Sequence, residues 1–558
     1  MLDRFEDGFR RTLDWASAGR LRATALILIV ALAVVLPGLW AMPVTDRDEA
    51  RFAQASKQML ETGDLIDIRF QDEPRWKKPV GIYWLQAASA QVLGGGPEAG
   101  IWAYRVPSAL AAVLAALLTV WAARPLIGDR AAVLAGLMMA TSLLLAGEAN
   151  IAKTDAALLA SAIAVLGGMA HLLLGAGGWG AVLIFWLGIA GGILLKGPIV
   201  PAIAVLAFVW IWIATRAPPA FMRFKPLAGV ALTVALVAPW LVAIWIVSDG
   251  AFFAESLGRD MGAKLTSGQE KHWGPPGLYS ALVWLTFWPW AALLPLAAIG
   301  LWAGRREPWL RLLAGWVIPF WIILEIVPTK LPHYVLPVYP ALAIAVAAWV
   351  LSENRTEAPL WLRRASAVLT LLPVVLLIGA LLILPAILQQ KVVWPILPLV
   401  AIGGWAAWHA ARAAMDSRIR AQVAASLIAA LVLYPAVLQF GLPSLTTAFA
   451  SPRITALAQQ YQPCASGPLH SIGYREPSLI FLNGTETDNT GPATAIPALR
   501  NDPGAMVLIE SRWRGILGDD FPGGVVRGQV TYFNYNRGKF ETADLVTQDD
   551  PRWEACSN

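Results

Sequence analysis

Carboxylate and ammonium groups in this 558-residue chain gather beside the ends of long apolar runs. The positions concerned are Asp46, Asp48, Glu49, Arg51, Lys77, Lys78, Glu148, Lys153, Asp155, Lys196, Glu325 and Lys330. A carboxylate can act as a general base on a hydroxyl or amine nucleophile. Facing cations can stabilise a leaving phosphate, and lysine binds phosphate as a point charge. The pattern therefore indicates group transfer with a phosphate leaving group.

Two histidines lie among these groups, and their motifs carry little information. His272 precedes Trp273, and His333 follows Lys330-Leu-Pro332. The sequence has no HExxH, CxxC or Walker A motif. Nucleotide-dependent transport and kinase chemistry therefore find no support.

Composition indicates what kind of protein holds these groups. Of all residues, 57% are hydrophobic and 14% are charged, whereas globular domains have about 25% charged residues. Mean hydropathy is +0.58. A net charge of +6 over 558 residues is no basic patch, so a nucleic-acid partner is excluded. The chain is predicted to be an all-α polytopic membrane protein, because a transmembrane helix needs about 20 apolar residues.

Hydropathy and charge predict about thirteen spans. They are 23–42, 101–122, 131–147, 155–174, 179–195, 199–215, 226–247, 276–303, 312–328, 334–351, 366–388, 394–411 and 421–440. Five arginines between Arg4 and Arg22 place the N-terminal segment 1–22 on the cytoplasmic side, as an interfacial helix. When the spans are counted from this cytoplasmic N-terminus, the later arginine-rich loops also fall on the cytoplasmic side. Residues 441–558 are then predicted to lie outside the cytoplasm.

The lysines run against the usual cytoplasmic bias of basic residues. Ten of the eleven fall on the predicted outer side, and Lys225 alone falls in an inner loop. Single lysines near helix ends can reach the membrane interface with their ammonium group, and Glu148 and Glu325 can form plain ion pairs. Asp48 and Glu49 can stabilise a helix N-terminus. For the whole set we favour an anionic partner such as a lipid phosphate.

Three polar regions interrupt or follow the spans. The first outer loop, 43–100, contains an amphipathic helix candidate at 48–60, an extended piece at 65–70 and a second helix candidate at 80–93. A second outer loop covers 248–275. The tail, 441–558, has turn signals and β-rich runs at 505–509 and 525–535, which predict a small α/β domain. Both cysteines, Cys464 and Cys556, lie in it; an oxidising compartment favours a disulfide, and two free thiols are the alternative.

Several short motifs resemble one known family. They are Thr45-Asp-Arg-Asp-Glu-Ala-Arg-Phe52, Glu61-Thr-Gly-Asp64, Pro74-Arg-Trp-Lys-Lys-Pro79, Gly81-Ile-Tyr-Trp-Leu-Gln86, Lys153-Thr-Asp155, Leu195-Lys-Gly-Pro198 and Thr329-Lys-Leu-Pro-His-Tyr-Val-Leu-Pro337. Over about 40–440 the chain is similar to bacterial GT-C glycosyltransferases that use polyprenyl-phosphate sugars. The lipid A aminoarabinose transferases are the nearest group, with the protein O-mannosyltransferases related to them.

The resemblance implies roles for individual residues. Asp48 matches the catalytic acid of the first loop, and Asp155 matches a second essential acid. Lys78 matches the lysine of the family's acidic-Lys-Pro element, and Lys196 the lysine that holds the lipid phosphate. We further expect substrate binding by Glu49, Arg51, Lys77, Lys330 and His333.

The sequence departs from the family at Lys77. The aminoarabinose transferases typically have Glu there, and it helps to hold a divalent metal with a histidine that His272 matches. A cation at this position argues against a metal site, so no cofactor is expected to be required. A divalent metal with His272 as a ligand is the alternative. It also weakens the assignment of aminoarabinose and lipid A as substrates.

These observations together predict a multi-pass glycosyltransferase of the bacterial inner membrane, with the GT-C fold in 23–440 and a periplasmic C-terminal domain in 441–558. The expected donor is a sugar on undecaprenyl phosphate or another polyprenyl phosphate. The expected acceptor is lipid A or another glycan or glycolipid, ahead of a protein, and the expected assembly is a monomer among membrane lipids. The alternatives are a lipid flippase or solute transporter, and a polymerase or ligase of surface polysaccharide.

Overall fold

The structure, a computed structural model, describes residues 1–175, 177–263, 273–353, 358–389, 391–535 and 537–556. Within these residues, nine helical segments are long and apolar enough to cross a membrane, or ten if one bent pair counts as a span. The nine are α2 (Arg20–Ala41), α5 (Ile101–Ala140), α7 (Asp155–Leu174), α8 (Trp179–Lys196), α10 (Pro226–Val247), α15 (Pro308–Ile326), η6 with α16 (Pro332–Leu351), α17 (Leu360–Gln389) and α19 with its continuation to Ser444 (Ile419–Ser444).

The remaining predicted spans also fall on helices. The bent pair joins α13 (Leu278–Thr286) to Trp290–Gly304 at 111°. Helix α9 (Ile199–Thr215) is apolar but shorter, and α18 (Ile396–Met415) packs between α17 and α19. The predicted spans 101–122 and 131–147 fall on α5 and the short α6 (Leu143–Glu148), and Gly128 breaks α5 with φ 76°. The multi-pass helical fold is confirmed, and the count of thirteen spans stays a prediction.

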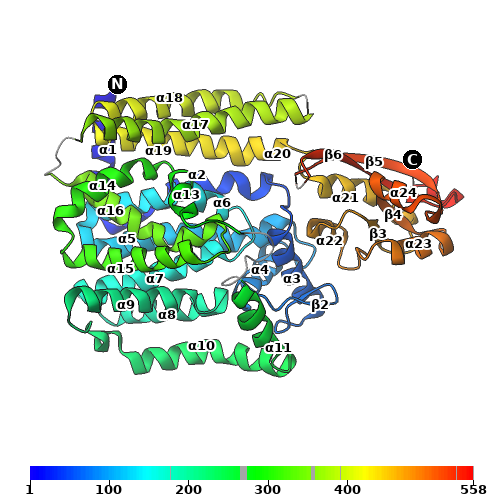
Figure 1. Cartoon of the computed structure of the whole chain (residues 1–558), viewed down its shortest axis with the longest axis horizontal. Helices are drawn as coiled ribbons and strands as arrows, with labels where there is room; N and C mark the ends of the chain where they lie inside the picture. The colour runs from blue at the N-terminus through cyan, green and yellow to red at the C-terminus, as the bar shows by residue number, and fades with distance from the viewer. Residues whose placement is uncertain (176, 264–272, 354–357, 390, 536, 557–558) are drawn as a thin grey trace.

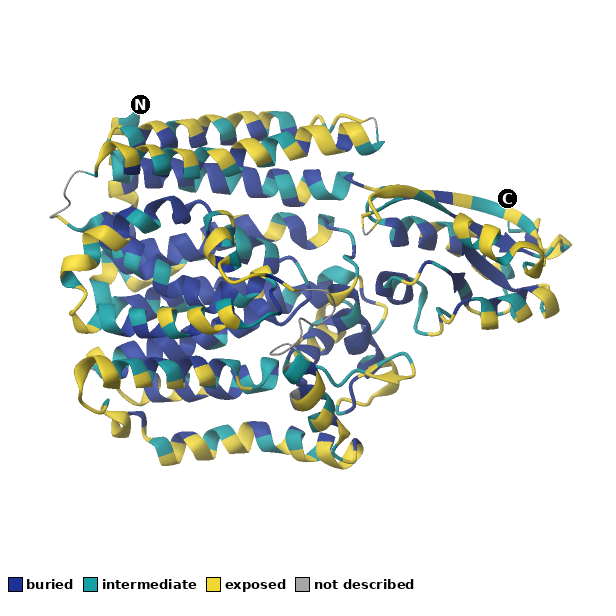
Figure 2. Cartoon of the chain, in the orientation of Figure 1, coloured by how far each residue is buried: buried dark blue, intermediate teal, exposed yellow. Residues whose placement is uncertain are grey.

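Burial separates the central helices from the lipid-facing ones. Helix α7 is mostly buried, whereas little of α10 and α17 is buried. Figure 2 shows this as a dark interior with yellow along the outermost helices. The N-terminal helix α1 (Leu2–Ser17) packs Phe9, Leu13 and Ala16 against the bundle. In a lipid environment such exposed apolar faces are expected, since the bilayer solvates them.

The first loop folds into two helices at one end of the bundle. Helix α3 (Asp48–Thr62) begins with two acidic residues and ends at Gly63, whose φ of 74° suits a glycine C-cap. A two-stranded ribbon of β1 (Arg69–Phe70) and β2 (Glu73–Pro74) leads to α4 (Gly81–Leu93). In Figure 1, α3 and α4 lie at the end of the bundle that also carries the C-terminal sheet. The sequence predicted both helices to within two residues.

The second loop is described only in part. Helix α11 (Ala251–Phe253) continues into the π-helix η2 (Ala254–Met261). His272, proposed from the resemblance as a metal ligand, lies outside the described residues.

The C-terminal domain is a small α/β unit, as the sequence predicted. Its four-stranded sheet has the order β3-β4-β6-β5, with β3 and β4 parallel and the other pairs antiparallel. The strands are β3 (Leu469–Ile472), β4 (Met506–Glu510), β5 (Val525–Asn534) and β6 (Lys539–Thr547), and the helices are α21 (Ala450–Tyr461), α22 (Pro477–Asn483), α23 (Pro492–Asn501) and α24 (Ser511–Leu517).

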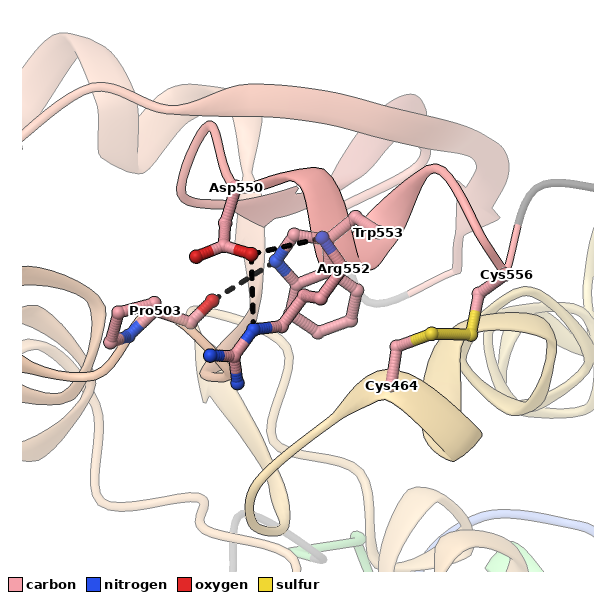
Figure 3. The surroundings of a disulfide bond; sticks show 6 residues. All are labelled: Cys464, Pro503, Asp550, Arg552, Trp553 and Cys556. Atoms are coloured by element: carbon pink, nitrogen blue, oxygen red, sulfur yellow. Dashed lines mark hydrogen bonds and ion pairs between the residues drawn. A yellow bond between two sulfur atoms is a disulfide. The ribbon is translucent and has the colours of Figure 1, made fainter.

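A disulfide joins Cys464 to Cys556, with their Cα atoms 6.3 Å apart. Figure 3 shows it beside Trp553, whose indole nitrogen donates a hydrogen bond to the Pro503 carbonyl (3.0 Å). The bond encloses the whole sheet, because it links the end of α21 to the last described residues. It therefore ties the tail back onto the domain.

The C-terminal domain rests on the first loop. Gln54 and Glu61 of α3 both bond the Thr485 hydroxyl, at 2.7 Å each. The Gln71 amide donates to the carbonyls of Thr485 and Thr487, at 2.8 and 2.6 Å. This docking places the domain beside the residues that follow the first span.

Candidate active site

A polar cavity of about 330 Å³ lies where the first loop meets the ends of α7 and α8. Seven basic and four acidic side chains face it, which favours an anionic ligand. Its lining consists of Asp46, Arg47, Asp48, Arg51, Phe52, Arg75, Lys77, Lys78, Lys153, Thr154, Asp155, Lys196, Asp260, Thr329, Leu331, His333 and Tyr334. Seven of the nine residues expected to be catalytic or substrate-binding are in this set: Asp48, Arg51, Lys77, Lys78, Asp155, Lys196 and His333.

Asp48 is an exposed carboxylate at the first position of α3. Among the described residues it forms no hydrogen bond or ion pair, so its oxygens are available to a ligand in the cavity. The residue before it, Arg47, has φ 65°, a left-handed conformation that costs a non-glycine residue about 1–3 kcal/mol. Such conformations cluster at functional sites, and here one turns the chain into the helix that presents Asp48.

Asp155 and Lys196 pair across the same end of two consecutive helices. Asp155 begins α7 and Lys196 ends α8, and their side chains approach to 2.6 Å. Lys153 lies 3.6 Å from the other Asp155 oxygen. Both ammonium groups are thus held at the cavity wall by one buried carboxylate.

Glu148 and His333 are two further members of this charged cluster. Glu148 lies 3.2 Å from the Lys153 ammonium and 3.7 Å from Nδ1 of His333. Nε2 of His333 lies 3.7 Å from Asp155. The cluster is buried, so its opposite charges must stay together. It can hold the lysines in fixed positions.

Lys78 reaches the same cavity because two helices approach closely. A Cβ atom on Gly81, at the start of α4, would lie 2.7 Å from the backbone oxygen of Leu194 in α8. Only glycine permits this approach, and it brings Lys78 near Lys196. The Lys78 ammonium lies 3.0 Å from Asp260 of η2, and that of Lys196 lies 5.0 Å from the centre of the Tyr334 ring.

An apolar cavity of about 500 Å³ adjoins the polar one. The two cavities share Lys77, Lys78, Lys196 and Asp260. The rest of the apolar wall comes mainly from α8 to α11 and consists of Pro79, Ile193, Gly197, Pro198, Pro201, Leu241, Phe252, Phe253 and Ser256. A polar cavity with cations at the mouth of an apolar one suits an amphiphile with an anionic head and a hydrocarbon tail.

The residues of this site do not fit a metal ion. Ligand atoms of Glu148, Asp155 and His333 lie within 4.8 Å of one another. Two ammonium groups, those of Lys153 and Lys196, already lie against these carboxylates. A divalent cation would have to displace them or bear their repulsion at close range. Lys77 is likewise a cation where the resemblance implies an acidic ligand.

Glu49 was expected to bind substrate, and the structure places it elsewhere. It is buried and pairs with Arg105 of α5 through two contacts of 2.7 and 2.9 Å. It also accepts hydrogen bonds from the Thr45 backbone (2.8 Å) and the Ala152 backbone (2.9 Å). Glu49 therefore fixes the start of α3 to the segment before Lys153 and does not line the cavity.

Lys330 was also expected in the substrate site, and its ammonium turns away from it. It donates to the carbonyls of Leu324, Glu325 and Val327, at 2.7, 2.9 and 2.9 Å. These carbonyls belong to the end of α15, where helices have acceptors without an intrahelical donor. The lysine caps a helix.

Arg75, Asp260 and Tyr334 also line the cavity and were given no role from the sequence. Arg75 and Tyr334 stand inside motifs already noted, so their position was a usable signal. Asp260 has no such signal, because the packing of the second loop alone brings it in. Glu148, noted from the sequence as a carboxylate at the end of a span, supports the site through Lys153.

Comparison with known proteins gives the class of fold. The crystal structure of ArnT from Cupriavidus metallidurans bound to undecaprenyl phosphate superposes with a TM-score of 0.73 at 19% identity, covering 93% of this chain and 97% of that one. The oligosaccharyltransferase of Archaeoglobus fulgidus gives 0.51 at 12% identity, covering 87% and 66%. The chain therefore has the GT-C fold of these membrane proteins.

Sequence comparison points to the same group. Residues 77–245 match the family described as dolichyl-phosphate-mannose-protein mannosyltransferase. The chain is similar to the undecaprenyl phosphate-alpha-4-amino-4-deoxy-L-arabinose arabinosyl transferases of Edwardsiella ictaluri (strain 93-146), at 31% identity over 344 residues, and Aeromonas salmonicida (strain A449), at 31% over 340. The matched part covers 58% and 59% of this chain and 58% and 60% of those relatives.

Proposed function

We propose that this protein is a glycosyltransferase that moves one sugar from a polyprenyl-phosphate donor to an acceptor at the outer face of the bacterial inner membrane. Residues 23–440 form the catalytic domain and 441–558 a periplasmic domain. The acceptor is lipid A or another glycan or glycolipid, with a protein as the weaker candidate. The arginine-rich loops support this orientation, with the N-terminus cytoplasmic.

One observation carries the proposal. The polar cavity that contains Asp48 and Asp155 opens beside an apolar cavity, and the lysines at positions 77, 78 and 196 face both. A polyprenyl phosphate has the matching shape: an apolar chain, one anionic phosphate and a sugar beyond it. The similar arabinosyl transferases are named for an undecaprenyl-phosphate sugar, which agrees with this donor.

The transfer is a single displacement. The acceptor oxygen or nitrogen attacks C1 of the donor sugar, and the bond from C1 to the phosphate oxygen breaks. Asp48 takes the proton of the attacking group, and the bond electrons leave with the phosphate. Attack opposite the leaving group inverts the configuration at C1.

The lysines stabilise the charge that develops on the leaving phosphate. Lys78 and Lys196 are held in place by Asp260 and Asp155, so little reorganisation is needed during the reaction. Phosphate leaves readily as an anion, so no strong general acid is required. Asp155 acts by positioning Lys196 and Lys153.

A reconstituted assay tests the proposal. Purified full-length protein in vesicles is given a polyprenyl-phosphate sugar together with a lipid extract, and release of free polyprenyl phosphate is followed by mass spectrometry. Release that depends on the acceptor is the expected result. A flippase would change the sidedness of the donor without release, and a polymerase or ligase would require a donor carrying a glycan chain. Either result would contradict the proposal.

A further inference from the structure

A second polar cavity, of about 270 Å³, lies mainly in the C-terminal domain. Its walls are the ends of β4 and β5, the loop between β3 and α22, and the side chains of Tyr535 and Arg537. The transmembrane domain contributes Asp46. Nothing in the proposed chemistry uses this cavity.

Asp46 lines both polar cavities, which makes them neighbours. It stands two residues before Asp48, and the hydroxyl of Ser478 in α22 donates a hydrogen bond to its carboxylate. A ligand whose reacting group lies at Asp48 can therefore extend past Asp46 into the C-terminal domain. In the proposed function the donor uses a different part of the polar cavity, which shares Lys77 and Lys78 with the apolar cavity.

One arginine of this cavity is placed to bind an anion. Arg475, Arg512 and Arg537 line the cavity together with the carboxylates of Asp46, Glu476 and Glu510. Arg537 pairs with Glu541 at 3.0 Å, and Arg475 donates a hydrogen bond to the Thr490 carbonyl at 3.1 Å. The Arg512 Nε atom lies 2.6 Å from the Glu510 carboxylate, whereas its two terminal nitrogens form no hydrogen bond with the described residues. The open edge of a guanidinium group binds phosphate or carboxylate through two parallel hydrogen bonds.

The other side chains of the cavity suit a sugar. Tyr474, Tyr532, Phe533 and Tyr535 supply aromatic surface, and rings with a polar edge pack against the apolar faces of a saccharide while bonding its hydroxyls. Glu510 is buried and accepts a hydrogen bond of 2.5 Å from the Tyr532 hydroxyl, which fixes that ring. Groups suited to bind an anion and to pack against a sugar ring thus lie in one cavity.

We propose that this cavity binds an anionic saccharide, namely the phosphorylated sugar of the acceptor that lies next to the group being glycosylated. This inference rests on the proposed function for the identity of the ligand as acceptor. The C-terminal domain then selects the acceptor, and the transmembrane domain supplies the donor site and the chemistry.

Binding to the full-length protein in detergent tests the inference. The probes are a phosphorylated diglucosamine without acyl chains and the same disaccharide without phosphate, followed by isothermal titration. We expect Arg512→Gln to raise the Kd of the phosphorylated probe about tenfold. Removal of the phosphate should cause a similar loss in the wild type. Arg500→Gln, an exposed arginine of α23 outside the cavity, is the matched control and should bind normally.

Kinetics separate this site from the catalytic one. In the assay that follows polyprenyl phosphate release, Arg512→Gln should raise the acceptor KM about tenfold and leave the donor KM unchanged. An Arg512→Gln protein that melts like wild type yet binds the phosphorylated probe equally well would overturn the site. Equal binding of the phosphorylated and the unphosphorylated disaccharide to the wild type would also overturn the site. Wild-type protein that binds the probe through Arg512 but releases no polyprenyl phosphate would leave the site standing and refute the proposed function.

Discussion

The ammonium nitrogen of Lys196, at the end of α8, lies 2.6 Å from the carboxylate of Asp155, at the start of α7. The lysine also faces both the polar and the apolar cavity. The Asp155 carboxylate thus holds the Lys196 ammonium group at the boundary between the polar and the apolar cavity, where the phosphate head of a bound lipid would lie. The proposed stabilisation of the leaving phosphate depends on this arrangement.

Substitution of Lys196 and substitution of Asp155 should therefore both lower the rate of sugar transfer, with different effects on the kinetic constants. Lys196→Gln should raise the donor KM and also lower kcat, because the phosphate loses a cation both in the bound state and in the transition state. Asp155→Asn should lower kcat by about 100-fold or more, since the lysines lose their fixed position, and removal of one preorganised group typically costs 10²–10³. Steady-state kinetics of polyprenyl phosphate release measures both.

Lys225→Gln is the control for these variants, because Lys225 lies in the loop between α9 and α10 and lines neither cavity. Unchanged donor KM and kcat in Lys196→Gln would show that the lysine does not contact the phosphate.

Asp46 should make stability depend on pH. Burial, and the nearby Glu476 carboxylate, raise the pKa of Asp46 from 3.8 to about 7. The charged and titratable groups around it are Arg47, Tyr474, Glu476 and Tyr535. The folded state therefore binds a proton more tightly than the unfolded state between about pH 4 and 7, and stability falls as the pH rises through this range.

Asp46→Asn removes this dependence, since its amide stays neutral and can still accept the Ser478 hydrogen bond. At pH 8 the variant should be more stable than wild type by about 1–2 kcal/mol, with little difference at pH 4. Thermal unfolding in detergent at both pH values measures this. A difference of the same size at both would mean that titration of Asp46 is not the cause.

Much of the site could be predicted from the sequence because several residues that line the cavity stand in short motifs or at the ends of apolar runs. Asp48 and Lys78 stand in the first-loop motifs, and Asp155 and Lys196 stand at ends of apolar runs that had to become helices. Consecutive spans run in opposite directions. A charged residue at the start of one span and a charged residue at the end of the next therefore lie at the same end of the bundle and can meet. This explains why the cavity could be anticipated without coordinates.

The errors have equally physical causes. Glu49 follows Asp48 by one residue, which in a helix is a rotation of about 100°, so it points into the protein and meets Arg105. Lys330 was predicted to bind substrate because it stands at the end of a span. In the structure its ammonium group instead donates to carbonyls at the end of α15, which lack a donor within the helix. Asp260 reaches the cavity only through the packing of the second loop, which no local pattern specifies.

The ion pair between Glu49 and Arg105 should be structural. Glu49→Gln leaves the Arg105 charge buried without its counterion, and breaking a buried pair in this way costs about 3–5 kcal/mol. Thermal unfolding should detect a large fall in the melting temperature. Glu73→Gln, an exposed glutamate of the same loop, is the control and should be neutral. A Glu49→Gln protein that melts normally but loses acceptor binding would instead favour a direct role.

The disulfide should stabilise the C-terminal domain alone. Replacing Cys464 and Cys556 by Ser opens a loop with a sequence separation of 92 residues, and such a loss typically costs about 2–4 kcal/mol. Hydrogen exchange should then rise in β3–β6 and remain low in the central helix α7. A reducing agent should reproduce the effect in wild type and leave the double Ser variant unchanged. Equal protection of the sheet in both proteins would contradict this prediction.

The rate of sugar transfer by Asp48→Asn measures whether Asp48 is the base in the displacement. Under single-turnover conditions with saturating donor and acceptor, we predict a fall of about 100-fold or more in polyprenyl phosphate release, because the attacking group loses its base. Donor binding should stay within about twofold, since the lysines remain. Asp72→Asn, an exposed aspartate of the same loop outside the cavity, should react at the wild-type rate. A wild-type rate for Asp48→Asn would contradict the account.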